Sequence, residues 1–243
     1  TGVANEYKVI ENSAQTFADN INEFSGMIGE RQVGCPLVVH RRCIEPMFSI
    51  SNMISYDNRM FNKTHKKEDY LKQEQPFLIK KSGWINVEGT ENGSKDHFVK
   101  NQAERVCQLL ENALHIYTNL YETDDKIFII TPFRTVAESM RKFVIGYFSV
   151  KGYDKEMLTK WTKNCVGTVH TFQGKDANEV LLVLGCSNKS AGAMNWVVKK
   201  ANILNVACTR AKYRIAFIGN LNDWKNRRYF REFIPKFIDT IDA

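Results

Sequence analysis

Short apolar segments of strand-like composition recur along this chain, and longer segments with helical periodicity separate them. The strand-like segments are residues 37–40, 84–87, 127–131, 166–170, 180–185 and 215–219. Several of them are apolar on both faces, as strands are when helices cover the sheet on both sides. The alternation predicts an α/β domain of three layers, in which a mainly parallel sheet is flanked by helices.

Four segments between or after these strands have the periodicity of amphipathic helices. They are residues 98–117, 136–148, 201–211 and a closing helix within 226–241. In the first, an apolar stripe is formed by Val106, Leu109, Leu110, Ala113 and Leu114. Such a stripe predicts a helix that packs one face against the sheet.

The chain divides into a lead-in and one large domain. Residues 1–35 are predicted to be a helical lead-in, and residues 36–243 the α/β domain, since 243 residues suit one large domain or one domain with a subdomain. Residues 55–82 are polar and are predicted to form a surface insertion or long loop. The first residues, Thr-Gly-Val, resemble no targeting signal, so we expect a processed or excised chain.

Composition indicates an ordinary globular protein of a reducing compartment. The chain is 43% hydrophobic and 25% charged, and no apolar run approaches the roughly 18 residues of a membrane span, so no membrane partner is expected. Its six cysteines include no C-x-x-C pair, which favours buried free thiols and argues against a zinc site. We therefore expect a cytoplasmic protein without a metal site of its own.

Positive charge is concentrated near the C-terminus. The net charge is +7, and residues 199–236 contain ten Lys or Arg but only two acids, Asp223 and Glu232. A bias of this kind fits a polyanionic partner. It also fits a solvated basic surface, and charge alone does not separate the two.

Polar residues follow several of the predicted strands, where open α/β sheets bind their ligands. Arg41 and Arg42 come after residues 37–40, Arg134 comes after 127–131, and a predicted helix carries Arg210 shortly before 215–219. Guanidinium groups gathered at one sheet edge suit a phosphate ligand, because they form bidentate hydrogen bonds. The alternative is that these arginines pair with nearby acids, but few acids adjoin them in the sequence.

The chain lacks a phosphate-binding P-loop. That loop requires G-x-x-x-x-G-K-[ST] between a strand and a helix, and residues 89–95 (GTENGSK) have the wrong spacing. No apolar strand ends in the Asp-Glu pair that would hold Mg²⁺. The sequence therefore combines arginines directed at phosphate with no nucleotide cradle.

Four segments resemble motifs of superfamily 1 helicases. GTVHTFQGKDANEVLLV resembles motif V, LNVACTRAKYRIAFIGN resembles motif VI, and IITPFRTVAESMRKF resembles motif IV. PLVVHRRCIEPMFSISNMISYDNRM is similar to the segment that follows motif III. The order and spacing resemble the second RecA-like domain of the branch related to the helicases of nonsense-mediated mRNA decay and Okazaki-fragment processing.

The resemblance implies roles for residues near a nucleotide. Arg210 matches the motif VI arginine that reaches the γ-phosphate of ATP from across the cleft between two RecA-like domains, and Arg42 matches a second γ-phosphate contact. Gln173 and Gly174 match the motif V pair that links the nucleotide to the nucleic-acid groove. Asp176 stands where the family usually has Glu on the nucleotide side.

The resemblance also implies residues near the backbone of a nucleic acid. They are Thr168 and His170 of motif V and Thr131, Pro132 and Phe133 of motif IV. One departure from the family pattern is Arg41, which replaces the usual Tyr; an arginine plane can still stack on a ring.

The function implied is that of the C-terminal motor domain of an ATP-dependent DNA or RNA helicase. Its partners would be single-stranded DNA or RNA and an N-terminal RecA-like domain, which would supply the P-loop and the acids for Mg²⁺. ATP and Mg²⁺ would bind to the complete protein, and the fragment alone would bind neither and be inactive. The alternatives are a nucleic-acid-binding module with a decayed nucleotide site and a metal-dependent nuclease or transferase, which would need clustered carboxylates.

Other candidate residues have structural explanations. His65, His97 and His115 are isolated in the sequence. Trp196 is expected in a loop before the motif VI helix and is interpreted as a packing residue rather than a platform for bases. Lys199 could contact a phosphate or end a solvated helix, and both interpretations stay open.

Overall fold

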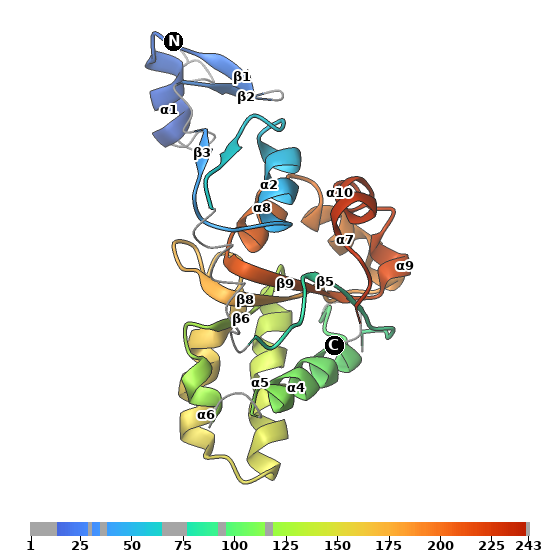
Figure 1. Ribbon diagram of the computed structural model, residues 1–243. Coiled ribbons are helices and arrows are strands. Elements are labelled where there is room, and N and C mark those ends of the chain that lie inside the picture. The colour runs from blue at the N-terminus through green and yellow to red at the C-terminus, as the bar shows by residue number, and fades with distance from the viewer. Residues whose placement is uncertain are drawn as a thin grey trace, which may run out of the picture.

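The architecture is a five-stranded parallel sheet between two layers of helices (Figure 1). A computed structural model describes residues 14–28, 31–34, 38–64, 77–91, 96–114 and 119–241. The sheet has the order β5-β9-β8-β6-β7. Its strands are β5 (Gly83–Asn86), β6 (Ile127–Thr131), β7 (Val166–Thr168), β8 (Ala177–Val183) and β9 (Ala211–Gly219), and all neighbours are parallel.

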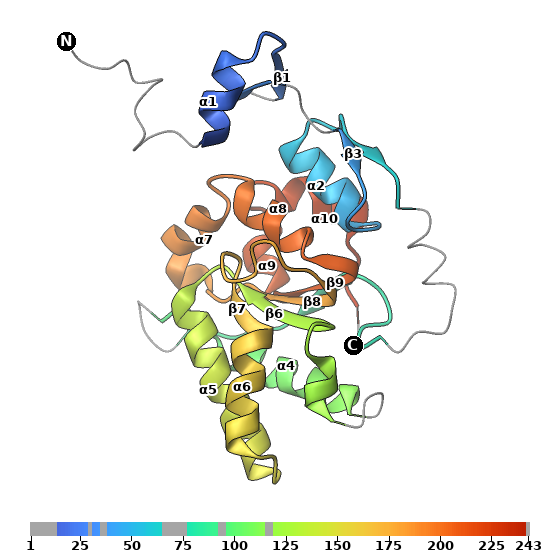
Figure 2. The same cartoon turned by 90° about the vertical axis from the view of Figure 1, so that its left-hand side faces the viewer.

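Helices cover both faces of this sheet. One layer contains α4 (Lys100–Ala113), α5 (Arg134–Val150) and α6 (Lys155–Cys165). The opposite layer contains α2 (Met47–Ser55), α8 (Asn202–Cys208) and α10 (Phe230–Phe237), and the short helices α7 (Ala191–Val197) and α9 (Leu221–Trp224) lie beside it (Figures 1 and 2). All five residues of β6 are buried, as a strand covered on both faces requires. The predicted three-layer RecA-like fold is confirmed.

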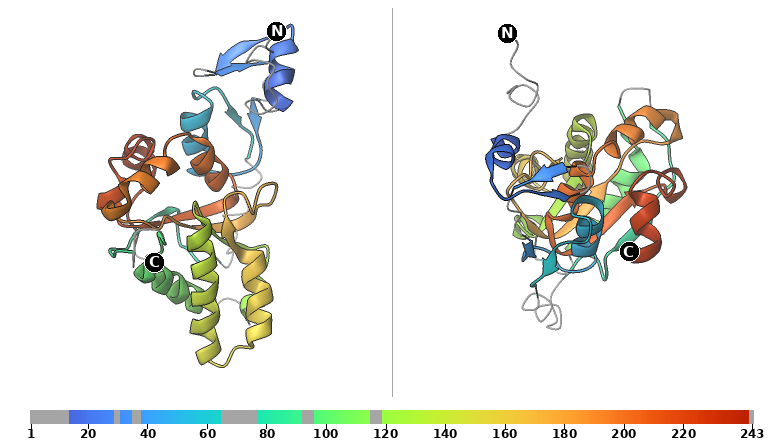
Figure 3. Two further views of the ribbon diagram at one scale, coloured as in Figure 1. Left: turned by 180° about the vertical axis from the view of Figure 1, so that it is seen from behind. Right: turned by 90° about the horizontal axis from the view of Figure 1, so that it is seen from above.

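Helix α6 was not predicted from the sequence. Its start is fixed by Asp154, whose side-chain oxygen accepts the Met157 N–H at 2.7 Å. Four of its side chains are buried: Leu158, Trp161, Thr162 and Cys165. Its apolar stripe is therefore narrow, and lysines interrupt it in the sequence, so the helical periodicity is weak. Together α5 and α6 form a hairpin that projects from the sheet (Figure 3).

Two strand predictions were wrong. The segment 37–40 does not enter the main sheet: its described part forms β3 (Val39–His40), which pairs only with β4 (Phe61–Asn62). Leu37 lies outside the described residues. The segment 166–170 ends as a strand at Thr168, because the chain then turns and Thr171 N–H bonds back to the Thr168 carbonyl at 3.0 Å.

The lead-in is not entirely helical. Helix α1 (Ala14–Ile21) is followed by the antiparallel strands β1 (Gly26–Ile28) and β2 (Arg31–Val33). Residues 1–13 of the predicted lead-in lie outside the described residues. In Figures 1 and 2 this small unit lies next to β3 at one end of the molecule.

Part of the predicted surface insertion is core. Residues 65–76 lie outside the described residues, but Ile79 is fully buried. The carboxylate of Glu179, in the middle strand β8, accepts the N–H groups of Leu78 at 2.7 Å and Ile79 at 2.8 Å. This buried contact between segments 100 residues apart fixes the chain just before β5.

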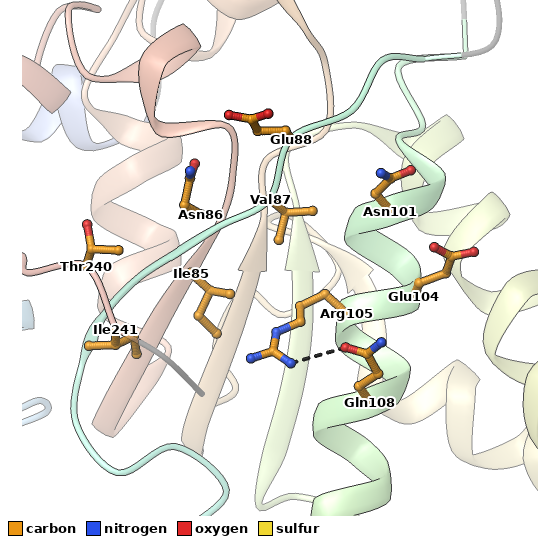
Figure 4. A pocket seen from close by; sticks show the side chains of 10 residues that line it. All are labelled: Ile85, Asn86, Val87, Glu88, Asn101, Glu104, Arg105, Gln108, Thr240 and Ile241. Carbon is orange, nitrogen blue, oxygen red and sulfur yellow. Dashed lines mark hydrogen bonds between the residues drawn. The ribbon is translucent and has the colours of Figure 1, made fainter.

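The C-terminal end of the described chain adds a short parallel pairing to the sheet edge. Trp84 of β5 donates its N–H to Asp239 O, and its own carbonyl accepts the Ile241 N–H, both at 2.8 Å. Between this end, β5 and α4 lies a hollow of about 450 Å³, in which Arg105 bonds to Gln108 (Figure 4). None of the predicted site residues lines it.

The connection from β7 to β8 has no helix. Thr168, the last residue of β7, lies opposite Thr131 at the end of β6, whereas β8 begins beside the start of β6. Residues 169–176, which we call the strap, therefore run from the carboxyl ends of the strands back to their amino ends. Phe172 of the strap is buried and stacks on Phe128 of β6, with ring centroids 4.2 Å apart. No described helix is long and apolar enough to span a membrane.

Candidate functional site

Three of the five residues predicted to lie near a nucleotide meet in one hollow of about 590 Å³. Arg42, Arg210 and Asp176 line it together, although they come from three separate segments. The remaining lining residues are Val39, His40, Arg41, Tyr56, Asn205, Val206 and Thr209. The sequence thus singled out three residues of this hollow, and the structure shows that they share it.

The hollow does not lie at the sheet edge that we expected. Asp176 directly precedes β8 and Arg210 directly precedes β9, so both stand at the amino ends of parallel strands. Thr131 and Thr168, by contrast, end β6 and β7 at the carboxyl edge. The expectation of a single edge was wrong because the strap returns the chain to the start of β8 at Asp176, and because α8 leads into the start of β9 at Arg210.

Arg210 is held by main-chain carbonyls. Arg210 is only 4% exposed. Its Nη1 donates to the carbonyls of Lys175 at 2.7 Å and Phe172 at 3.2 Å. Its Nε donates to Val206 O at 3.1 Å. The guanidinium thereby joins the end of α8 to the strap and lies where both border the hollow.

The electrostatics of the hollow favour an anion. Burial lowers the pKa of Arg210, and the positive charge of Arg42 lowers it further. Two like charges that face one hollow repel each other, and a bound anion would relieve that repulsion. A phosphate offers the acceptor oxygens that two guanidinium groups can share.

Asp176 has a partner within the chain. Its Oδ1 lies 2.8 Å from Nζ of Lys212, and each side chain is about one-third exposed (34% and 30%). The carbonyl of Lys212 in turn accepts the Ile44 N–H at 3.1 Å, two residues after Arg42. The ion pair therefore joins the end of the strap to β9, and the main-chain hydrogen bond of Lys212 joins β9 to the segment that carries Arg42.

Asn205 is a lining residue that sequence reasoning did not single out. Its side-chain Oδ1 is buried and has no hydrogen-bond partner among the described residues. Asn205 lies on α8 and Thr209 caps its C-terminal end one turn later, so both face the hollow with Arg210 next to them. The sequence does contain a signal for Asn205. Polar residues at positions i and i+4 lie on the same face of a helix, and here that face ends beside Arg210.

Gln173 and Gly174 lie apart from this hollow. Both are exposed on the strap, and neither belongs to the lining. Gly174 has a φ of +88°, a conformation that glycine adopts without strain. The main-chain N–H of Gln173 donates to His170 O at 3.2 Å, which makes this part of the strap a tight turn.

The residues predicted to lie near nucleic acid divide into buried and exposed groups. Thr131, Pro132 and Phe133 are buried, so they support the carboxyl edge rather than form its surface. Thr168 and His170 line a hollow of about 350 Å³ at this edge. Their neighbours there are Arg134, Ala137, Glu138, Arg141 and Thr171.

The two arginines of this smaller hollow have different tasks. Arg141 donates from Nε and Nη2 to the carbonyl of Val166, at 2.9 and 2.6 Å, and so caps the edge strand β7. Arg134 is exposed and pairs with Glu138 on the same helix at 2.9 Å. Thr168 and Thr171 share a hydrogen bond between their hydroxyls at 3.0 Å, which closes the first turn of the strap.

The described residues show no metal-binding group. No cluster of three or more His, Cys, Asp or Glu side chains occurs among them. Among the described residues, the hollow of Arg42 and Arg210 has three guanidinium groups and a single carboxylate, Asp176, which is paired with Lys212, and this set fits phosphate oxygens better than a divalent cation.

Several known proteins are similar to this chain. An uncharacterised ATP-dependent helicase of Methanocaldococcus jannaschii is 26% identical over 214 residues, which cover 82% of this chain and 28% of that protein. The regulator of nonsense transcripts 1 homologue of Arabidopsis thaliana is 32% identical over 39% of this chain and 7% of its own length. The ATP-dependent helicase NAM7 of Saccharomyces cerevisiae is 28% identical over 45% of this chain and 11% of its own length.

These relatives confirm the resemblance to helicases that the motifs indicated. The chain spans less than a third of the length of each of the three proteins. A solved C-terminal domain of a possible DNA helicase from Lactobacillus covers 74% of this chain and 87% of its own, at 10% identity and a TM-score of 0.39, too distant to bear on the fold. A family model described as "AAA domain", AAA_12, matches residues 23–222, and the chain therefore belongs to the AAA_12 family.

Proposed function

We propose that this chain is the second motor domain of an ATP-dependent helicase that acts on single-stranded DNA or RNA. The observation that carries the proposal is the hollow in which Arg42 and Arg210 meet although 168 positions separate them. Two guanidinium groups on separate segments can hold a terminal phosphate from two sides. The similarity to ATP-dependent helicases supports ATP as the source of that phosphate.

ATP would require a second domain of the same protein. The chain has no P-loop, and the donors of the hollow fit phosphate rather than Mg²⁺. The proposed N-terminal RecA-like domain would supply the cradle and the metal ligands. Arg42 and Arg210 would then stabilise the negative charge that develops on the transferred phosphoryl group, as arginine fingers do.

The geometry of Arg210 links this step to the strap. To reach a phosphate, its guanidinium must exchange at least part of its bonding to the carbonyls of Phe172 and Lys175. Both carbonyls belong to the strap, whose other end carries Thr168 and His170 at the carboxyl edge. Phosphate binding and release would thus change the restraint on the residues proposed to contact the nucleic acid.

The proposal is tested on the complete protein. ATP hydrolysis is measured with and without a single-stranded oligonucleotide, for the natural protein and for Arg42→Ala and Arg210→Ala. We expect each substitution to lower kcat by about 10³–10⁵-fold, as loss of an arginine finger does. Arg105→Ala is the control, because it removes a half-buried arginine from the separate hollow beside α4.

Three results would contradict parts of the proposal. Hydrolysis by the 243-residue chain alone, abolished by Arg210→Ala, would show that no second domain is needed. Oligonucleotide binding by the complete protein without any ATP turnover would favour a nucleic-acid-binding module with a decayed nucleotide site. Turnover unchanged by both arginine substitutions would contradict the proposed role of the hollow.

We also propose a cytoplasmic setting, which the buried free thiols of the five described cysteines support.

A further inference from the structure

A fourth hollow lies at the carboxyl side of the sheet and contains none of the motif residues. It has a volume of about 700 Å³ and lies between α7 and residues 226–228, which follow α9. Its lining is Gly192, Asn195, Trp196, Val198, Lys199, Asn226, Arg227 and Arg228. Three of these residues are basic and none is acidic, so the hollow offers a positive surface.

Trp196 differs from the other tryptophans of the chain. It is 48% exposed, whereas Trp84, Trp161 and Trp224 are at most 2% exposed. Contrary to the sequence interpretation, it lies on helix α7 and not in a loop, and about half of its surface packs against nothing. Its open surface lines the hollow beside three basic residues, so the ring is accessible to a ligand that stacks on it.

The indole ring is held in place on its inner side. Its centroid lies 5.8 Å from that of Phe133, and Phe133 lies 4.9 Å from the ring of His97. Arg227 fixes the helix itself, since its Nη1 donates to the Asn195 Oδ1 at 2.6 Å. A ring that is anchored on one face and open to solvent loses little conformational freedom when a ligand stacks on it.

Two cations are available beside this ring. Lys199 and Arg228 are exposed, and in the described part of the chain no carboxylate lies within ion-pair distance of either. The guanidinium of Arg228 lies over the ring of Tyr229, 4.8 Å from its centroid, which restrains it on this side of the hollow. Arg227 is engaged with Asn195 and serves as a clamp rather than a ligand.

We propose that Trp196, Lys199 and Arg228 form a stacking subsite for single-stranded nucleic acid. One base would lie on the open face of the indole, and the adjoining phosphates would contact the two cations. An anchored aromatic ring beside unpaired positive charges is the combination by which proteins bind a single strand without sequence preference. The subsite rests on the proposed function and adds to it a contact that the helicase motifs do not include.

The location of the subsite agrees with this ligand. Helix α7 follows β8, and residues 226–228 follow β9, so the hollow shares the carboxyl side of the sheet with Thr131 and Thr168. Phe133, which adjoins Trp196, begins directly after β6 and connects the two places. A strand bound at Thr168 and His170 can therefore continue toward the indole along one side of the domain.

The test uses tryptophan fluorescence of the full 243-residue chain. Since Trp196 is the exposed tryptophan, stacking of a base should quench the solvent-exposed part of the emission. We expect saturable quenching by a 20-residue oligothymidylate, and no such quenching in Trp196→Phe. Binding of the same oligomer, followed by anisotropy of a label on its end, should weaken by about 5- to 100-fold in Trp196→Ala, as for loss of one base–aromatic stack.

Matched variants and probes separate stacking from other effects. An abasic oligomer of the same length keeps the phosphates, so Trp196→Ala should leave its affinity unchanged, whereas Arg228→Ala should weaken the binding of both oligomers. Trp196→Tyr, which keeps a flat ring, should retain most of the oligothymidylate affinity. Phe61→Ala is the control for loss of an exposed aromatic, since Phe61 is 64% exposed and lies on β4.

The possible results distinguish the subsite from the proposed function. Oligonucleotide binding that neither quenches Trp196 nor responds to Trp196→Ala overturns the subsite and leaves the helicase proposal intact. Equal weakening of both oligomers by Trp196→Ala shows a packing role and overturns stacking. Failure of both the chain and the complete protein to bind any single strand overturns both proposals.

Discussion

The Nη1 atom of Arg210 lies 2.7 Å from the carbonyl oxygen of Lys175. One side chain thus joins the segment similar to motif VI to the strap of the segment similar to motif V. The same atom lies 3.2 Å from the Phe172 carbonyl, so one side chain bonds to two main-chain acceptors on the strap. Arg210 therefore has a structural task that can be measured apart from its proposed role at a phosphate.

Replacement of Arg210 should loosen the strap. Arg210→Ala leaves the carbonyls of Phe172 and Lys175 without their charged donor, and we expect it to lower the free energy of unfolding by about 2 kcal/mol. Hydrogen exchange of the amides at 169–176 should accelerate, because their restraint is lost. Arg42→Ala, which removes an exposed arginine of the same hollow, should change neither quantity by much. Equal effects of the two substitutions would contradict the structural task.

The ion pair of Asp176 and Lys212 should contribute little to stability. Both side chains are about one-third exposed (34% and 30%), so water screens their attraction. A double-mutant cycle with Asp176→Ala and Lys212→Ala should give a coupling energy below about 1 kcal/mol, and 1 M salt should reduce it. A coupling of several kcal/mol that salt leaves unchanged would show that the pair is shielded from solvent.

The free energy of unfolding should fall as the pH rises toward 7, because the pKa of the buried Glu179 carboxyl is raised. Burial raises the pKa of this carboxyl from 4.5 to about 7, against the opposing effects of the Ile79 and Leu78 amides and of Arg214. Above pH 4.5 the unfolded chain releases the proton while the folded chain keeps it. A rise in pH therefore lowers the free energy of the unfolded state relative to the folded state. The loss continues up to about pH 7 and then levels off, with a total on the order of 3 kcal/mol.

Glu179→Gln should remove this pH dependence. We expect urea denaturation between pH 5 and 8 to give a sloping free energy of unfolding for the natural chain and a flatter one for the variant. The variant should also be less stable at pH 5, since an amide offers only one acceptor oxygen to the Leu78 and Ile79 amides. Glu104→Gln, at an exposed pair with Lys100, should keep the slope. A slope that persists in Glu179→Gln would assign it to other groups.

Two glycines should respond differently to alanine. Gly174 has a φ of +88° with no heavy atom within 4 Å of an added Cβ, so Gly174→Ala should cost only backbone strain, about 1–2 kcal/mol. Gly185 has a φ of +62°, and its added Cβ would lie 2.7 Å from His97 O, so Gly185→Ala should cost more. Gly174→Asn should be milder than Gly174→Ala, because Asn tolerates this conformation. Thermal denaturation of the three variants gives the order, and a cost for Gly174→Ala above that for Gly185→Ala would contradict it.

The local parts of the fold were predictable from the sequence. The strand Ile127–Thr131 has the predicted bounds, because five consecutive buried positions leave an apolar run with clear ends. The central part of α4 also follows its apolar stripe. Motif similarity identified Arg42, Arg210 and Asp176, which the structure brings to one hollow.

The remaining features depend on contacts between distant segments. Glu179 bonds to the Leu78 amide across 101 positions, and no local pattern marks that pair. The strap that returns the chain to the start of β8 has no helix, so no periodic pattern marks its course beside Arg210. The exposure of Trp196 depends on which distant segments pack against it, and the sequence alone favoured a packing role in a loop.

The strap has one further consequence, which concerns the coupling between the proposed phosphate and nucleic-acid ligands. Most parallel connections carry a helix, which moves as a rigid block and averages small displacements over many contacts. The strap is bare main chain fixed near its middle by Phe172 against Phe128. Under the proposed function, a substitution at this aromatic contact would change how stiffly one proposed ligand site responds to the other, with the residues of both sites unchanged. The strength of that communication would then vary separately from affinity and from catalytic rate.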